Sequence, residues 1–278
     1  MNLLTKQENA VYYLKDSETK EILYGGAAGG GKTALGCLWL IEMCQIHKGS
    51  RWLMGRSKLK ALKETTLNTF FELCSDLGIT NQFTYNAQAN IIYWNNGSEI
   101  LLKDLFLYPS DPNFDSLGSL EICGAFIDEC NQVVFKAWQI VTSRCRYKLK
   151  EFGIIPKVLG SCNPAKNWTY KEFYEPNKTN SLKSYRKFIQ ALPTDNPHLP
   201  KSYLESLLSL DSNSRERLYH GNWEYDNDPN TLCGYEDILS IFTNDHIIGG
   251  TKYITADIAR MGSDKALIGV WKGFDLIE

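Results

Sequence analysis

The chain has 278 residues, of which 43% are hydrophobic and 22% are charged, and its formal net charge is −2. This balance is typical of a folded globular protein and excludes a disordered or collagen-like chain, while the near-neutral charge excludes a basic field over the whole surface that would attract DNA or an anionic membrane. We therefore expect one large α/β domain with a smaller appendage, and any contact with nucleic acid should be local.

Neither a membrane span nor a secretion signal is predicted. The longest mostly apolar run, residues 34–46, is interrupted by Glu42 and is too short to cross a bilayer. The N-terminus MNLLTKQENA lacks a basic start followed by an apolar stretch. The eight cysteines have no CxxC spacing, so we expect core thiols in a soluble cytoplasmic protein; they are at positions 37, 44, 74, 123, 130, 145, 162 and 233.

Strand-like and helical stretches alternate along the chain. A capping-box pattern at residues 5–8 predicts an opening helix, and an Asn96-Gly97 pair predicts a hairpin turn. Alternation of this kind implies a mostly parallel sheet with helices on both faces. The predicted elements in chain order are a strand at 21–24, a helix from 32, a strand at 51–55, a helix at 58–77, a hairpin at 91–102, strands at 122–127 and 157–161, and a largely helical segment within 192–223.

The first strand runs into a sequence that fits the phosphate-binding pattern GxxxxGK[ST], followed by a helix. Its residues are Gly26, Ala27, Ala28, Gly29, Gly30, Gly31, Lys32 and Thr33. Glycines allow backbone N–H groups to turn inward around phosphates, Lys32 would reach the β- and γ-phosphates of ATP, and the Thr33 hydroxyl would bind Mg²⁺. The alternative is a flexible glycine-rich loop, which the flanking strand and helix disfavour.

The apolar run at 122–127 ends in two acids, Asp128 and Glu129. Asp128 is placed to hold the Mg²⁺ of a P-loop site, and Glu129 to polarise the attacking water as a general base. Strands also end in surface acids simply because polar residues stop them. Two consecutive acids in a chain with a P-loop favour ATP hydrolysis over nucleotide binding alone.

Two further polar groups are candidates for nucleotide contacts. Ser161 and Asn163 follow the next predicted strand and would lie beside the γ-phosphate, although Asn163-Pro164 is also a turn former. Gln7 lies in the first turn of the opening helix, where its amide could pair with adenine or simply be solvated.

The roles of several cations are left open by the sequence. Arg144 and Arg146 include a candidate arginine finger, which could come from a neighbouring subunit, but either arginine could instead be a surface charge or a contact to DNA phosphates. Arg56 has the same ambiguity. A local DNA-binding patch could use residues of the predicted helix at 58–77, namely Lys58, Lys60 and Lys63, or these could be a solvated helix face.

Taken together and in order, the short motifs of this chain resemble those of phage terminase large subunits. They are GGAAGGGKT, FIDEC, SRCRY, SCNPAKNW, ALPTDNPHLPKSYLESLLSL and RERLYHGNW. The resemblance implies an additional-strand, RecA-like P-loop ATPase that works as a homo-oligomeric ring in the host cytoplasm. It would pump double-stranded DNA through a portal protein, aided by a terminase small subunit. It also implies that Gln7 contacts adenine and that residues 161–163 couple hydrolysis to DNA movement.

The same resemblance divides the chain into an ATPase domain with its lid at 1–223, a linker at 224–250 and the start of an RNase H-like nuclease domain at 251–278. Residues 252–271 alternate like a β-hairpin, and Asp257 would be the first metal-binding carboxylate. A two-metal nuclease site needs several converging carboxylates, and Asp264 cannot complete it. We therefore expect an incomplete domain in a truncated chain, without cleavage activity.

Two other functions fit the P-loop. A helicase or remodelling ATPase acting on nucleic acid would need a second, similar domain, which the sequence lacks. A nucleotide-dependent binding switch would hydrolyse ATP slowly and would depend little on Glu129.

Overall fold

The computed structural model describes residues 3–225, 249–258 and 266–277. The chain divides into two compact units, residues 1–226 and 227–278, which are considered separately below. Most of the predicted linker at 224–250, together with Cys233 and Asp264, lies outside the described residues. No helix of the described chain is long and apolar enough to cross a membrane.

The first unit is built on an eight-stranded sheet with the order β3-β4-β5-β2-β6-β7-β1-β8. The six strands from β5 to β8 in this order run parallel, whereas β3 and β4 join antiparallel at one edge. The predicted mostly parallel sheet is confirmed. The strands are β1 (Glu21–Gly26), β2 (Arg51–Arg56), β3 (Phe83–Asn86), β4 (Ile91–Trp94), β5 (Glu99–Asp104), β6 (Gly124–Ile127), β7 (Lys157–Cys162) and β8 (Arg186–Ala191).

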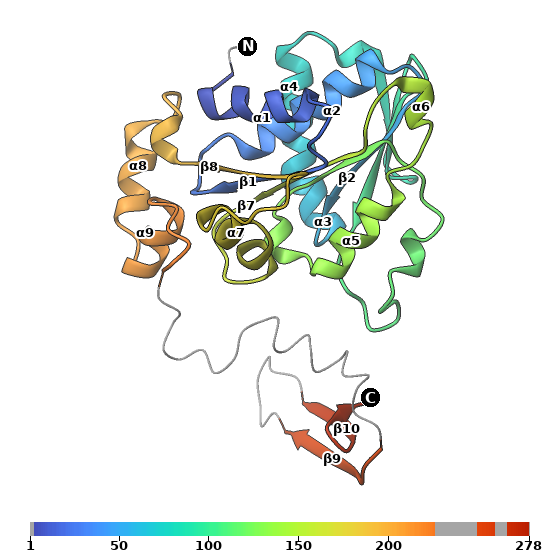
Figure 1. The fold of residues 1–278 in the computed structure, drawn as a ribbon, viewed down its shortest axis with the longest axis vertical. Helices are drawn as coiled ribbons and strands as arrows, with labels where there is room; N and C mark the ends of the chain where they lie inside the picture. The colour runs from blue at the N-terminus through green and yellow to red at the C-terminus, as the bar shows by residue number, and fades with distance from the viewer. Residues whose placement is uncertain (1–2, 226–248, 259–265, 278) are drawn as a thin grey trace. The chain divides into compact units, whose positions relative to one another are not determined.

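Helices cover both faces of this sheet, as Figure 1 shows. On one face lie α1 (Thr5–Lys15), α2 (Lys32–Ile46) and α4 (Leu67–Asp76), and on the other lie α5 (Phe135–Arg144) and α7 (Glu175–Lys178). The helix α2 is apolar on nearly all sides because it is enclosed by the sheet, α1 and α4. The helices α8 (Lys201–Leu208) and α9 (Ser212–Leu218) form the predicted helical segment.

One strand separates the two strands that carry the main candidate residues. The P-loop follows β1 and the acids Asp128 and Glu129 follow β6, while β7 pairs with both strands. This is the additional-strand arrangement that the resemblance implied. Because all three strands are parallel, their carboxyl ends lie at one edge of the sheet.

Two helix predictions need correction. The opening helix begins one residue earlier than its capping-box pattern implied, with Leu4 as the N-cap residue, and the Leu4 N–H donates to Gln7 Oε1 at 2.9 Å. The helix predicted at 58–77 is not uniform. It consists of α3 (Leu59–Ala61), a π-helical turn at Leu62–Thr66 and then α4.

Buried charged side chains connect several elements at the amino edge of the sheet, which is opposite the edge with the candidate residues. Glu21 Oε2 accepts hydrogen bonds from Arg186 Nε and Trp138 Nε1, each at 3.0 Å. Arg186 also forms an ion pair with Glu172. Since Glu21 and Arg186 are both more than 90% buried, each charge depends on the other for compensation.

In the second unit, the described residues form a small antiparallel sheet. It contains β9 (Lys252–Asp257), β10 (Leu267–Lys272) and β11 (Asp275–Leu276), with β9 paired to β10 over six residue pairs. The predicted hairpin is therefore present. Its apolar side chains are largely exposed, including Ile254 and Leu267.

Candidate nucleotide-binding site

The loop between β1 and α2 requires glycine at two positions for different reasons. Gly26 has φ +138°, and a Cβ there would lie 2.2 Å from the carbonyl oxygen of Ala191. Gly31 has φ +70°, and a Cβ there would lie 2.6 Å from Gln7 Nε2. A larger residue would adopt a left-handed backbone at either position, and it would clash with the backbone of β8 at Gly26 and with the Gln7 side chain at Gly31.

The backbone N–H groups of this loop fall into two sets. Those of Ala27 and Ala28 donate to Ala191 O and Leu218 O, each at 2.9 Å. The next five, from residue 29 to residue 33, have no acceptor within the described part of the chain. They end at the N-terminus of α2, where the helix dipole also favours negative charge. Because consecutive unpaired donors beside a helix N-terminus suit an anion, the loop fits a phosphate group.

The Lys32 ammonium lies within this loop. Its Nζ donates to the carbonyl oxygens of Gly26 and Ala27 and to Asn163 Oδ1 at 3.1 Å. Burial lowers the pKa of Lys32, and the nearby Cys162, Glu129 and Asp128 partly offset that effect. Lys32 and Asn163, which are 131 residues apart in the sequence, are therefore neighbours in the fold, while a place for Asn163 beside the γ-phosphate stays a prediction.

Asp128 lies at the carboxyl end of β6, and its side chain is almost completely buried. Oδ1 accepts hydrogen bonds from Thr33 Oγ1 at 3.2 Å and from Ser161 Oγ, and Oδ2 accepts one from Thr66 Oγ1 at 2.6 Å. Arg56 NH1 is 3.9 Å from Oδ2. Three hydroxyl groups thus orient both oxygens of this carboxylate, and carboxylate oxygens are ligands that Mg²⁺ prefers.

Glu129 has an unusual backbone and an unusual environment. Its φ and ψ are 50° and 45°, the left-handed conformation that non-glycine residues seldom adopt. Its N–H donates to Ser161 Oγ at 3.3 Å. Burial and the adjacent Asp128 raise the pKa of Glu129, against the opposing effect of Arg56, Lys32 and Arg217. Strain and a raised carboxyl pKa together are typical of functional sites.

Gln7 contacts the same loop from α1. Its Nε2 donates to Gly31 O at 2.9 Å, while its Oε1 accepts from the Leu4 N–H. An amide has two N–H donors and two oxygen lone pairs, so one of each is left over. The remaining N–H donor and oxygen lone pair could together pair with adenine. The adenine contact itself stays a prediction.

Arg144 and Arg146 are not brought to this site within one chain. Ile122 N donates to Arg144 O, and Arg146 pairs with Glu121, so both arginines lie at the start of the strand that Asp128 ends. The six residue-to-residue steps from Ile122 to Asp128 span about 20 Å at 3.3 Å per step. Within one chain these arginines are therefore at the wrong edge for an arginine finger, and a role toward a neighbouring subunit stays a prediction.

Three contributions to the site were not predicted. Thr66 comes from the π-helical turn, and Arg217 of α9 lies close enough to Glu129 to lower its pKa. Asn196 Nδ2 donates to Gly29 O at 2.8 Å, so the segment that carries α8 and α9 contacts the P-loop directly. No local pattern marks these residues, because each reaches the site through tertiary packing.

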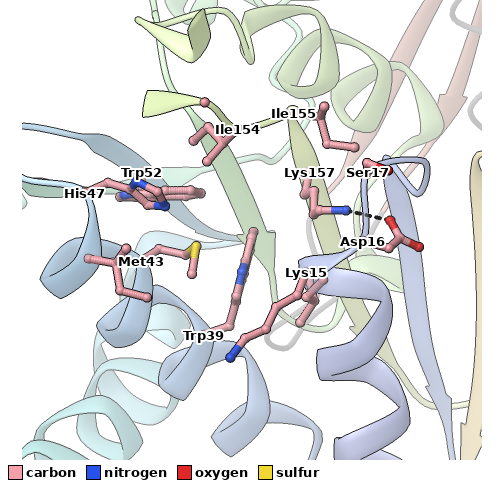
Figure 2. Close-up of a pocket in the computed structure, with 13 residues that line it drawn as sticks. Lys15, Asp16, Ser17, Trp39, Met43, His47, Trp52, Ile154, Ile155 and Lys157 are labelled. Atoms are coloured by element: carbon pink, nitrogen blue, oxygen red, sulfur yellow. Dashed lines mark hydrogen bonds and ion pairs between the residues drawn. The ribbon is translucent and has the colours of Figure 1, made fainter. Parts of the chain in front are cut away.

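A cavity of about 370 Å³ lies at the amino edge of the sheet, away from the P-loop. Figure 2 shows its aromatic side chains and Lys157, which points toward Asp16. Lys157 Nζ donates to Asp16 Oδ1 at 3.1 Å and to the carbonyls of Tyr13 and Thr19 at 2.9 and 2.7 Å. All three ammonium protons are thus used within the protein, and we assign the cavity no part in the nucleotide site.

In the second unit, Asp257 is the last residue of β9 and pairs with Leu267 of β10. Among the residues that the structure describes, no three carboxylate, histidine or cysteine side chains gather where they could hold a metal ion. The metal-binding role of Asp257 therefore remains a prediction.

Comparison with known proteins adds a family and a fold. The family model described as phage terminase large subunit matches residues 17–221. The PBSX phage terminase large subunit of Bacillus subtilis (strain 168) is 22% identical over 215 residues, which are 72% of this chain and 47% of that protein. The chain thus spans about half the length of this curated relative.

Two solved structures have a similar fold. The large terminase from a thermophilic bacteriophage, solved in complex with ATP-gamma-S, gives a TM-score of 0.62 at 15% identity, over 98% of this chain and 65% of that one. The ATPase domain of the Thermus phage P74-26 large terminase gives a TM-score of 0.57 at 13% identity, over 80% of this chain and 94% of that one.

Proposed function

The chain belongs to the phage terminase large subunit family, and we propose that it binds and hydrolyses ATP to drive double-stranded DNA into a procapsid. The observation that carries this proposal is the run of five N–H groups at residues 29–33 that have no acceptor among the described residues, in a loop at the same edge of the sheet as Asp128 and Glu129. The large terminase of the thermophilic bacteriophage, with which this chain shares its fold, was solved in complex with ATP-gamma-S, which supports ATP as the nucleotide.

We propose that the phosphates of ATP occupy the N–H run and that Lys32 exchanges its carbonyl partners for β- and γ-phosphate oxygens. Thr33 and Asp128 supply oxygen ligands of the kind that Mg²⁺ prefers. When bound, Mg²⁺ would neutralise the charge that builds up on the phosphates. Gln7 would contact the adenine with the amide groups left over from its backbone contacts.

For the chemical step, Glu129 would accept a proton from the attacking water. The water oxygen bonds to the γ-phosphorus as the bond from that phosphorus to the β,γ-bridging oxygen breaks. Because burial raises its pKa, Glu129 is a stronger base than an ordinary glutamate. Arg56 and Arg217 lie near enough to lower the pKa of this carboxyl group, and Ser161 links the backbone N–H of Glu129 to Asp128 Oδ1.

The wider assembly is proposed from the family. DNA, a portal protein and a terminase small subunit are the expected partners, within a homo-oligomeric ring in the host cytoplasm. Because Arg144 and Arg146 lie at the amino edge of the sheet, a ring would be needed for either to reach a P-loop. Neither DNA-contacting residues nor a nuclease activity are assigned to this chain.

Steady-state phosphate release by this chain and by its Lys32→Ala and Glu129→Gln variants tests the ATPase. We expect Mg²⁺-dependent hydrolysis by the parent, loss of nucleotide binding in Lys32→Ala, and retained binding without turnover in Glu129→Gln. Hydrolysis at the parent rate by both variants would refute the site, whereas a nucleotide-dependent switch would show a very slow parent rate that Glu129→Gln leaves unchanged.

The motor function is tested on the full-length protein by packaging linear DNA into empty procapsids. Protection of the DNA from added nuclease should require ATP. Protection that is independent of ATP would refute the motor.

A further inference from the structure

A π-helical turn at Leu62–Thr66 interrupts the helix that follows β2. Such turns are rare, are usually one turn long, and occur often at functional sites. Here the turn ends at Thr66, whose hydroxyl contacts the carboxylate that we propose as a metal ligand. The turn therefore directs side chains at the nucleotide site from a helix outside the P-loop.

Thr66 is buried and forms hydrogen bonds through both its side chain and its backbone. It is completely buried, and its Oγ1 donates to Asp128 Oδ2 at 2.6 Å. Its backbone carbonyl accepts a weak hydrogen bond from Cys37 Sγ of α2 at 3.6 Å. A buried hydroxyl bonded to a charged carboxylate fixes the orientation of that carboxylate, because the bond is worth more than a neutral one.

The preceding residue, Thr65, contacts the other charge. Arg56 NH1 donates to Thr65 Oγ1, and the Thr65 hydroxyl donates in turn to Ala61 O at 2.7 Å. Arg56 NH1 is 3.9 Å from Asp128 Oδ2, at the outer limit of an ion pair. Thr65 thus binds the Arg56 guanidinium, and Thr66 binds the Asp128 carboxylate. These bonds keep the two groups apart, although their opposite charges would attract each other.

We infer that Thr66 is a positioning residue that keeps Asp128 available to Mg²⁺, an inference that rests on the proposed ATPase. Without the Thr66 hydroxyl, Oδ2 loses its shortest hydrogen bond and keeps only the longer one from Thr33 Oγ1 at 3.4 Å, with Arg56 NH1 at 3.9 Å. The carboxylate would turn toward the guanidinium, and that ion pair would compete with the metal. Thr65 holds the guanidinium back on the other side.

The test is Mg²⁺-dependent binding of a fluorescent, non-hydrolysable ATP analogue, with EDTA as the metal-free condition. Outer-shell partners of metal ligands typically change metal affinity 10- to 100-fold. We expect Thr66→Val to lower the Mg²⁺-dependent affinity at least tenfold while binding in EDTA stays at the parent value. Thr66→Ser should restore it, and adding Arg56→Gln to Thr66→Val should recover part of the loss.

Thr19 provides a matched control. It too is completely buried, and its Oγ1 donates to Asp16 Oδ2 at 2.6 Å, but at the amino edge of the sheet. Thr19→Val removes the same kind of bond and should leave the Mg²⁺ dependence unchanged. Thr66→Ala, which adds no methyl group beside the carboxylate, replaces Thr66→Val if that variant does not fold.

Parent-like Mg²⁺ dependence in a folded Thr66 variant without the hydroxyl would overturn the inference and leave the proposed ATPase intact. An equal loss in Thr19→Val would overturn it as well, because general destabilisation would then explain both. Failure of the parent itself to bind the analogue with Mg²⁺ would instead refute the proposed function.

Discussion

Replacing Glu129 with glycine should stabilise the protein while strongly slowing ATP hydrolysis. Glu129 has φ 50° and ψ 45°, so its backbone is in a conformation that glycine adopts readily and glutamate does not. Its carboxyl group is also buried enough for its pKa to be raised. Both features cost folding energy in the parent, and both disappear in Glu129→Gly.

The magnitude follows from two opposing backbone effects. The left-handed conformation costs a non-glycine residue roughly 1–2 kcal/mol. Glycine in turn loses more freedom on folding, by roughly 0.5–1 kcal/mol. The net gain for Glu129→Gly is therefore about 0–1.5 kcal/mol, with a further gain from removing the buried charge. A lost general base should lower kcat by about 10²- to 10⁴-fold.

Urea unfolding and phosphate release measured on the same samples provide the assay. Glu129→Gln separates the two effects, because it keeps the strained backbone and removes only the charge. Since the folded-state pKa of Glu129 is raised, its ionisation destabilises the fold at a pH above that value. The gain from Glu129→Gln should therefore be largest above the folded-state pKa of Glu129, shrink as the pH falls below it, and be absent below the lower pKa of the unfolded chain.

Lys148 is a matched control for the backbone, since it has φ 46° and lies outside the site. Lys148→Gly should give a similar backbone gain, less any contribution from its exposed ion pair with Glu151, without changing kcat. A Glu129→Gly variant less stable than the parent by about 1 kcal/mol or more, or one that still hydrolyses ATP at the parent rate, would refute the reasoning.

Three further predictions concern acid, adenine and the buried ion pair. The pKa of Glu129 is raised, so this carboxylate should become protonated, and lose its function as a base, at a pH higher than the ordinary glutamate pKa of about 4.3. The fall of kcat on the acid side should therefore lie above that pH. A fall at or below it would contradict the assignment. Gln7→Ala should weaken binding of ATP more than of GTP, and equal weakening in a competition assay would count against an adenine contact. Arg186→Met should cost about 3–5 kcal/mol in urea unfolding by leaving Glu21 buried without its cation, and a cost below about 1 kcal/mol would contradict that role.

The main features of the fold could be predicted because each strand and helix has its own local pattern. The strand before the P-loop and the strand before Asp128 are continuous apolar runs, as buried parallel strands are. The strand β8 was missed because it lies at the sheet edge, where it mixes polar and apolar residues and even its buried residues include the charged Arg186. The π-helical turn at residues 62–66 was missed because its two buried residues, Leu62 and Thr66, are four positions apart, as they would be on one face of an ordinary helix.

The candidate site could be predicted where its residues lie at or shortly after the end of a strand. Lys32, Asp128 and Ser161 each lie at or just beyond the carboxyl end of a parallel strand, so they had to meet at one edge. Arg217 and Asn196 reach the same edge from the segment around α8 and α9. The packing of that segment on the P-loop depends on tertiary contacts that no periodicity in the sequence describes.

Arg144 and Thr66 show that the direction of the chain predicts which residues lie near the nucleotide site better than residue spacing does. A helix that connects two parallel strands must return the chain from the carboxyl edge of the sheet to the amino edge. Residues at the start of such a helix therefore remain near the nucleotide, whereas residues at its end do not. Thr66 follows β2 by ten residues and reaches Asp128, but Arg144 ends α5 and meets Ile122 at the amino edge. By this rule an arginine finger within the same chain should be sought in the first turns after a strand, and any role for Arg144 in hydrolysis requires a second subunit.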